Sequence, residues 1–126
     1  MKHGERHEHA ASPDIPFDRD QTTELMPART DDRYKNSQLT ELGPAFLTFE
    51  EAGQTDQWIL RYEEVLYVVT GELTLAVRDG ERDYTVSGGE GDVITIAKGA
   101  TVRYGGSKGT RVCVCFTPLN WQDLIG

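Results

Sequence analysis

The sequence is poor in histidine, cysteine and basic residues. Its 126 residues include three histidines, all before Ala10, and two cysteines. Lys and Arg number 13 against 21 Asp and Glu, a net charge of −8. Nucleic acids and anionic membrane surfaces attract basic patches, so the acid excess argues against both as partners.

Long apolar runs are also missing. None approaches the roughly 18 residues that span a bilayer, and residues 1–14 contain no apolar stretch that could form a signal-peptide core. Cys113 and Cys115 are separated by about 6.6 Å along an extended chain, an awkward geometry for a mutual disulfide. We predict that they are buried thiols in a reducing compartment, and therefore expect a cytoplasmic protein.

Glycine-punctuated β-type runs fill most of the chain, which is long enough for one domain with one core. Runs rich in Val, Ile, Leu, Tyr and Thr favour strands, and no helical run separates them, so an all-β sandwich or small barrel is expected. Asp79-Gly80 favours a type I′ hairpin turn between two of the strands. The expected strands are 45–52, 57–62, 64–70, 72–78, 82–87, 92–97, 101–105 and 111–117.

The N-terminal part differs in composition from the rest. Residues 1–22 carry many charges and few apolar side chains, so burial cannot offset their ordering entropy, and we expect a flexible arm preceding a barrel over residues 23–126. A short strand or helical turn is expected near residues 24–26, a strand near 37–39, and a short helix or cap after Pro118.

Two stretches resemble the signature motifs of the cupin superfamily. Glu64, followed by Gly71, matches the end of the first motif, and Gly91 with Gly99 matches most of the second. The resemblance implies a conical antiparallel barrel, the double-stranded β-helix or jelly roll, with the functional site inside it.

The sequence lacks most of the metal ligands of the cupin motifs. The resemblance implies that a metal site in this fold would consist of three histidines and one glutamate. Of that set, this sequence has only the glutamate, Glu64. A lone carboxylate is a poor transition-metal site, so we expect no metal and no other cofactor. The histidine positions hold Trp58 and Leu60, or Gln57 and Ile59, and Val102.

Within the cupins, residues 43–123 are similar to the ethanolamine-utilisation Q (EutQ) family. The resemblance implies an acetate-kinase reaction linked to a bacterial microcompartment, and the cupins in general imply a homodimer. It is carried by Trp58, Leu60, Tyr62, Glu63, Glu64 and Gly71, by Ala97-Lys98-Gly99, and by Asn120-Trp121-Gln122.

Glu64 is the leading catalytic candidate. Strand alternation places it on one face with Trp58, Leu60 and Tyr62, and the motif places that face inside the barrel. A carboxyl group in an apolar interior has a raised pKa and can serve as a general acid or base. The alternative is a glutamate near the mouth that only forms a hydrogen bond with Tyr62 or Tyr104.

Five other residues complete the candidate site. Tyr62 and Tyr104 are catalytic candidates that could orient a substrate or carry a proton, although packing is the commoner role of tyrosine in a small barrel. Trp58 is expected to fill the volume of the missing metal and to line the substrate site. Lys98 and Arg103 could contact an anionic ligand, or they could simply be solvated.

These observations lead to one main hypothesis and two alternatives. The main one is a EutQ-like cupin that acts, without a metal, on a small carboxylate or phosphorylated metabolite in the barrel interior. The first alternative is a non-catalytic cupin that binds a small molecule or serves as a scaffold. The second is a metalloenzyme with an unusual Glu/Tyr site.

Overall fold

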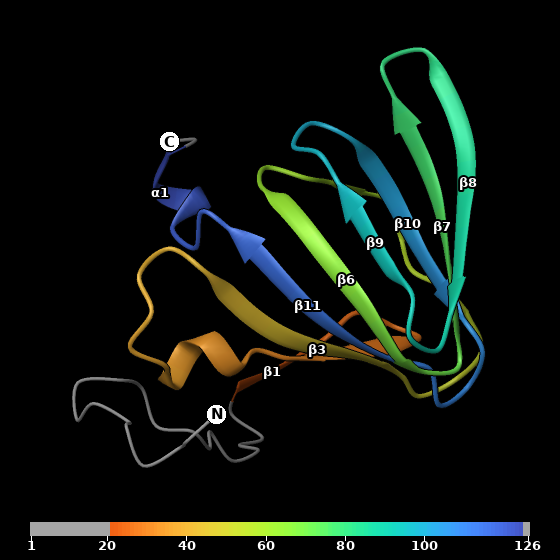
Figure 1. The fold of residues 1–126 in the computed structure, drawn as a ribbon, viewed down its shortest axis with the longest axis horizontal. Helices are drawn as coiled ribbons and strands as arrows, with labels where there is room; N and C mark the ends of the chain where they lie inside the picture. Colours follow the sequence, from red (N-terminus) through yellow and green to blue (C-terminus); the bar gives the residue numbers. More distant parts are fainter. Residues whose placement is uncertain (1–20, 125–126) are drawn as a thin grey trace.

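Antiparallel strands arranged in two sheets make up most of the computed structural model, which describes residues 21–124 (Figure 1). Apart from Gln21 and Thr22, the expected arm lies outside the described residues, and Thr22 already begins the first strand. No helix among the described residues is long and apolar enough to cross a membrane.

The larger sheet has six strands and brings together segments far apart in the sequence. Its order is β1-β2-β3-β11-β6-β9, so β11, near the C-terminus, lies between β3 and β6. A short 3-10 helix, η3 (Arg33–Asn36), follows β2. The strands are β1 (Thr22–Glu24), β2 (Ala28–Asp31), β3 (Gly43–Phe49), β6 (Glu63–Thr70), β9 (Val93–Ile96) and β11 (Arg111–Thr117).

The smaller sheet has five strands and ends in a long hairpin. Its order is β4-β10-β7-β8, and β5 also pairs with β10. The β7–β8 hairpin forms one edge of the molecule, and the short helix α1 lies beyond the end of β11 (Figure 1). The remaining elements are β4 (Gly53–Gln54), β5 (Trp58–Ile59), β7 (Glu72–Asp79), β8 (Arg82–Gly89), β10 (Thr101–Gly106) and α1 (Trp121–Leu124).

The core lies between the two sheets and follows the period-two pattern of the strands. Alternate residues are buried along β3, β6 and β11, and along β7 as far as Val77. This alternation is what a sheet with one face in the core and one face in solvent requires. The largest fully buried side chains are Phe49, Leu60, Leu66, Leu73 and Leu75.

The all-β expectation is confirmed, and each expected run overlaps an observed strand. Three local expectations were wrong. Residues 37–39 form no strand. The β7–β8 turn has Gly80 and Glu81 at its centre, and only Gly80 has a positive φ, which is the type II′ pattern rather than type I′. Cys113 and Cys115 are half-buried free thiols on the outer face of β11, not buried ones, because the odd-numbered residues of this strand point outward.

Candidate functional site

Strand β6 places Glu64 inside the barrel. The alternation along this strand turns Glu64 inward and Glu63 outward, and only 6% of Glu64 is exposed. Its cross-strand neighbours are Ile96 on β9 and Phe116 on β11, both buried and apolar. The expected inward position of this carboxyl group is confirmed.

A hydrogen bond joins Glu64 to the opposite sheet. The phenol of Tyr104, a buried residue of β10, donates to Oε1 of Glu64 over 2.7 Å. Tyr104 is held in turn by Thr55, which exchanges two hydrogen bonds with its backbone: Thr55 N–H donates to the Tyr104 carbonyl and Tyr104 N–H donates to Thr55 Oγ1. The pair therefore connects the two sheets through the interior.

Burial sets the acidity of this pair. Removal from water raises the pKa of Glu64 to about 7, and the hydrogen bond from Tyr104 opposes that rise. Burial, with the nearby Glu64 charge, also raises the pKa values of the Tyr62 and Tyr104 phenols. Glu64 can therefore take up and release a proton near neutral pH, while both tyrosines remain protonated donors.

Tyr62 and Trp58 lie at one end of the interior. Nε1 of Trp58 donates to the Tyr62 hydroxyl over 2.9 Å. Tyr62 is buried, but Trp58 is 43% exposed, so the expectation that it fills the former metal volume was wrong. Because the chain bends between β5 and β6, Trp58 does not continue the inward series of β6.

The sequence analysis missed the role of Trp121 at this end. Its ring centroid lies 5.5 Å from that of Tyr62 and 6.3 Å from that of Trp58. Phe116 continues the cluster, 4.8 Å from Tyr62, and Tyr34 follows, 5.3 Å from Phe116. The Asn-Trp-Gln stretch that supported the family resemblance was the available signal, but it gave no position for the ring.

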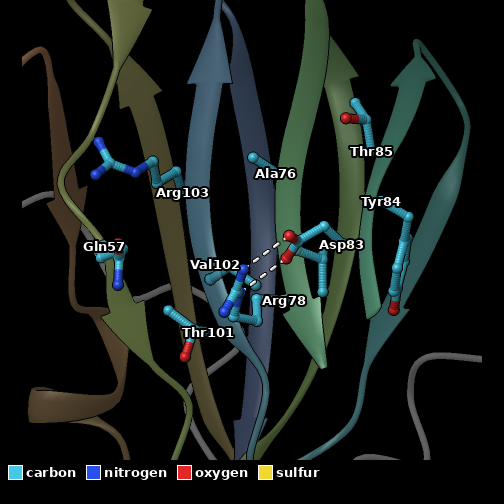
Figure 2. Close-up of a pocket in the computed structure, with 10 residues that line it drawn as sticks. Gln57, Ala76, Arg78, Asp83, Tyr84, Thr85, Thr101, Val102 and Arg103 are labelled. Carbon is cyan, nitrogen blue, oxygen red and sulfur yellow. Dashed lines mark hydrogen bonds and ion pairs between the residues drawn. The ribbon is translucent and has the colours of Figure 1, made fainter. Parts of the chain in front are cut away.

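The structure separates Lys98 and Arg103 from this interior. Lys98 is exposed in the turn after β9. Arg103 is exposed on β10 and points to the opposite side of the strand from Tyr104. It lines a pocket of about 470 Å³ on the outer face of the smaller sheet, together with Ala76 and Thr85 (Figure 2).

An ion pair forms part of the wall of this outer pocket. Arg78 on β7 and Asp83 on β8 lie opposite each other, and two hydrogen bonds of 2.8 Å join them (Figure 2). Arg103 has no carboxylate within ion-pair distance among residues 21–124. The predicted site residues are thus divided between the interior and the outer pocket, and Lys98 belongs to neither.

The residues of the interior do not fit the transition metal that metal-binding cupins hold there. Glu64 is bonded to a phenol and surrounded by apolar side chains, and a single carboxylate lacks the nitrogen or sulfur donors of a transition-metal site. Throughout the described part of the chain, no group of three His, Cys, Asp or Glu side chains is placed to hold a metal ion.

Comparisons with known proteins identify the family. The family model described as ethanolamine utilisation protein EutQ matches residues 17–123. The EutQ protein of Clostridium difficile is 22% identical, with 85% of this chain and 83% of that one covered and a TM-score of 0.61. An ethanolamine utilization protein Q from Salmonella typhimurium LT2 is 24% identical, with 75% and 73% covered and a TM-score of 0.60.

A solved structure with lower sequence identity identifies the fold. An RmlC-like cupin family protein with a double-stranded β-helix fold, from Methanocaldococcus jannaschii, is 14% identical, with 70% and 79% covered and a TM-score of 0.57. No curated protein sequence matches the chain. Because the family model covers most of the chain, this protein belongs to the EutQ family, and it shares the double-stranded β-helix fold of the cupin family protein.

Proposed function

We propose that the protein acts, without a bound metal, on a small carboxylate or phosphorylated metabolite inside the barrel, with Glu64 as the proton-transfer group. The observation that carries this proposal is the buried Glu64–Tyr104 pair. Its hydrogen bond connects the two sheets, and its carboxyl group has a pKa of about 7. A group with that pKa is half protonated at neutral pH, where general acid–base catalysis is most effective.

The interior would hold an anion through O–H donors. Among residues 21–124 no Lys or Arg is buried, so a ligand oxygen beside Glu64 would meet neutral groups. Protonated Glu64 can donate to such an oxygen. The Tyr62 hydroxyl can donate as well, because the Trp58 N–H occupies one of its acceptor positions and leaves its own proton available. Binding of an anion would therefore weaken as pH rises through 7.

Phosphoryl transfer between ATP and acetate is the first reaction to assay, as the family resemblance suggests. We expect Glu64→Gln to lower turnover by about 100-fold or more, since a positioned acid–base group contributes about 10² to 10⁴ in rate. Glu63→Gln is the matched control, because the neighbouring carboxylate points outward, and it should retain wild-type turnover. Equal inactivity of wild type and Glu64→Gln would contradict the enzyme proposal.

Metal independence has a separate test. Protein purified without chelators should contain no stoichiometric metal by elemental analysis. A full equivalent of iron, zinc or manganese would contradict this part of the proposal and favour the metalloenzyme with a Glu/Tyr site.

The outer pocket supports a second candidate function, a non-catalytic cupin that binds a small molecule. Its volume falls within the range of small-ligand sites, and the Arg103 guanidinium has no carboxylate partner among the described residues. In a thermal-shift screen of carboxylated and phosphorylated metabolites, a ligand of this pocket should raise the melting temperature of wild type but not of Arg103→Gln. A ligand of the interior should instead lose its effect in Glu64→Gln.

A further inference from the structure

Three arginines line one pocket on the outer face of the larger sheet. They come from three elements: Arg29 from β2, Arg33 from η3 and Arg111 from β11. The chain has 13 Lys and Arg against 21 Asp and Glu, so this convergence of guanidiniums runs against its overall charge. The pocket has a volume of about 340 Å³, and we call it the arginine pocket. Its other lining residues are Thr22, Asp31, Thr48 and Glu50.

The strand register brings two of these arginines together across a threonine. Thr48 on β3 lies between Arg29 on β2 and Arg111 on β11. Thr48 points outward, since its neighbours Leu47 and Phe49 are both buried in the core. A threonine is much shorter than an arginine, so the middle of this row is low and its two ends are high.

Phe46 holds two of the guanidiniums in place. It occupies the next outward position of β3, beside Asp31 on β2. The Arg111 guanidinium lies 4.0 Å from the centroid of its ring, and the Arg33 guanidinium lies 5.3 Å from the same centroid. Two positive charges from distant parts of the chain are thus held against one aromatic ring by cation–π contacts.

Arg29 and Arg33 are already paired with carboxylates. Arg29 bonds Glu24 over 3.4 Å and Glu50 over 3.2 Å. Nε of Arg33 donates to Oδ2 of Asp31 over 2.6 Å. These bonds fix both guanidiniums at the wall of the pocket.

Arg111 is the arginine with unused donors. No carboxylate lies within ion-pair distance of it among residues 21–124. Of its five N–H groups, one bonds in this part of the chain, from Nη1 to Thr48 Oγ1 over 3.0 Å. Its charge lacks a counter-ion, so an anion that enters the pocket would bind Arg111 through charge-assisted hydrogen bonds.

Asp31 provides an unused acceptor in the same pocket. Its side chain lines the pocket, and the residue is only 7% exposed. Oδ2 accepts from Arg33, whereas Oδ1 is buried and accepts no hydrogen bond within residues 21–124. A buried acceptor without a partner is unfavourable, and a hydroxyl group on a ligand would satisfy it.

These donors and this acceptor define the chemistry of the ligand. Guanidiniums that reach the pocket from three elements approach a bound group from different directions. A phosphoryl group presents three acceptor oxygens in different directions, whereas a carboxylate has two in one plane. The volume of about 340 Å³ is at the lower end of small-molecule sites, which leaves room for an organic part beside the phosphoryl group.

We propose that the arginine pocket binds a small phosphate ester that carries a free hydroxyl group, with the phosphoryl group on Arg111 beside Arg33 and the hydroxyl on Oδ1 of Asp31. The site lies on the outer side of the larger sheet. It is therefore separate from the Glu64–Tyr104 pair in the interior and from the outer pocket on the smaller sheet, and it does not depend on the function proposed for either.

Titration of the full chain with glycerol 3-phosphate, followed by NMR of the backbone amides, tests the site. Saturable shifts should appear around Thr48 and Arg111. Arg111→Gln should raise the dissociation constant about 10-fold or more, because it removes charge-assisted hydrogen bonds. Arg111→Lys keeps the charge but loses the planar fork, and should raise the constant about 3-fold even where the glutamine variant does not fold. No saturable shift at up to about 10 mM ligand would overturn the proposal.

Control variants show whether the binding belongs to this pocket. Lys108→Gln removes one exposed cation from the turn between β10 and β11 and should bind as wild type does. An equal loss of affinity in Lys108→Gln and Arg111→Gln would reduce the effect to net charge and overturn the proposal. A loss confined to Arg103→Gln or Glu64→Gln would place the ligand in the outer pocket or in the interior, and would overturn it as well.

Selectivity for the hydroxyl group tests the role of Asp31. Methyl phosphate, which has no hydroxyl, should bind wild type about 10-fold less tightly than glycerol 3-phosphate, because it cannot donate to Oδ1. In Asp31→Asn the two ligands should bind within about 3-fold of each other, since the charged acceptor is gone. Equal affinities of the two ligands for wild type would show that Asp31 receives no hydroxyl group, and the proposed ligand class would be wrong.

Discussion

Gly71 combines two requirements that only glycine meets. Its φ of +83° is unfavourable for side-chain-bearing residues, and a Cβ at this position would lie 2.7 Å from the Cα of Thr110. Thr110 cannot move aside easily, because it is fully buried and its Oγ1 accepts from the Glu72 N–H. The glycine of the first motif is therefore a packing requirement of the turn between β6 and β7.

This double requirement separates Gly71 from another left-handed glycine. We expect Gly71→Ala to lower the free energy of unfolding by about 3 kcal/mol or more, from backbone strain and overpacking together. Gly91 has a similar φ of +88° but open space around it, so Gly91→Ala should cost only about 1 kcal/mol. Urea denaturation of the two variants measures the difference, and equal losses would show that Thr110 gives way.

Tyr104 stabilises the charged form of Glu64. Removing its hydroxyl in Tyr104→Phe should move the Glu64 pKa above about 7, because the hydrogen bond opposes the effect of burial. Carbon-detected NMR titration of the Glu64 carboxyl group measures this change directly. Tyr84→Phe, at an exposed tyrosine, is the control and should leave the titration unchanged. A lower Glu64 pKa in Tyr104→Phe would mean that the phenol does not donate to this carboxylate.

Single residues also show where prediction from sequence ends. The inward position of Glu64 followed from alternation along one uninterrupted strand. Trp58 was misplaced because a bend, which a period-two pattern cannot detect, lies between it and β6. Arg103 was predicted either to contact an anionic ligand or to be solvated. Its separation from Tyr104 follows from the alternation along β10, because adjacent residues of a strand point to opposite faces.

At the scale of elements, the C-terminal segment covers the aromatic end of the barrel. We expect Trp121→Ala to lower the free energy of unfolding by about 2 kcal/mol, since the indole is partly buried against Tyr62 and Trp58. It should also increase acrylamide quenching of the remaining tryptophan, Trp58, which loses its neighbour. Ile59→Ala, at the residue next to Trp58 but on the opposite face, should alter neither quantity. Unchanged quenching in Trp121→Ala would contradict the contact.

The longer strands were the most predictable elements, because most of them are β-rich runs separated by turns that contain glycine. The hairpin turn was harder. Its type depends on the pairing of Asp79 with Arg82, which places Gly80 and Glu81 at the centre, and a dipeptide pattern does not fix that register. Residues 37–39 were predicted as a strand from local propensity, although no neighbouring strand pairs with them in the structure.

For the whole molecule, strand order could not be derived from the composition of the runs. β11 pairs with β3 on one side and β6 on the other, across most of the chain length. Only the resemblance to the cupins implied this topology, and the comparisons with solved structures support it. One consequence is that Glu64 and Tyr104 come from different sheets. The protonation state of Glu64 therefore affects the stability of the entire fold.

This link predicts how stability depends on pH. The pKa of Glu64 is about 7 in the folded protein and 4.5 for an unperturbed glutamate, so between these values the folded state binds more protons than the unfolded state. The free energy of unfolding must then fall as pH rises through this window. The full shift corresponds to roughly 3 kcal/mol, most of which is lost by pH 7.5.

Paired variants isolate this contribution from the other carboxylates. Glu64→Gln cannot ionise, so its free energy of unfolding, relative to wild type, should rise between pH 5 and pH 8 by roughly 3 kcal/mol. Glu63→Gln removes a carboxylate from the exposed side of the same strand and should follow wild type at every pH. Parallel curves for wild type and Glu64→Gln would mean that Glu64 has no raised pKa, and the proton-transfer proposal would lose its physical basis.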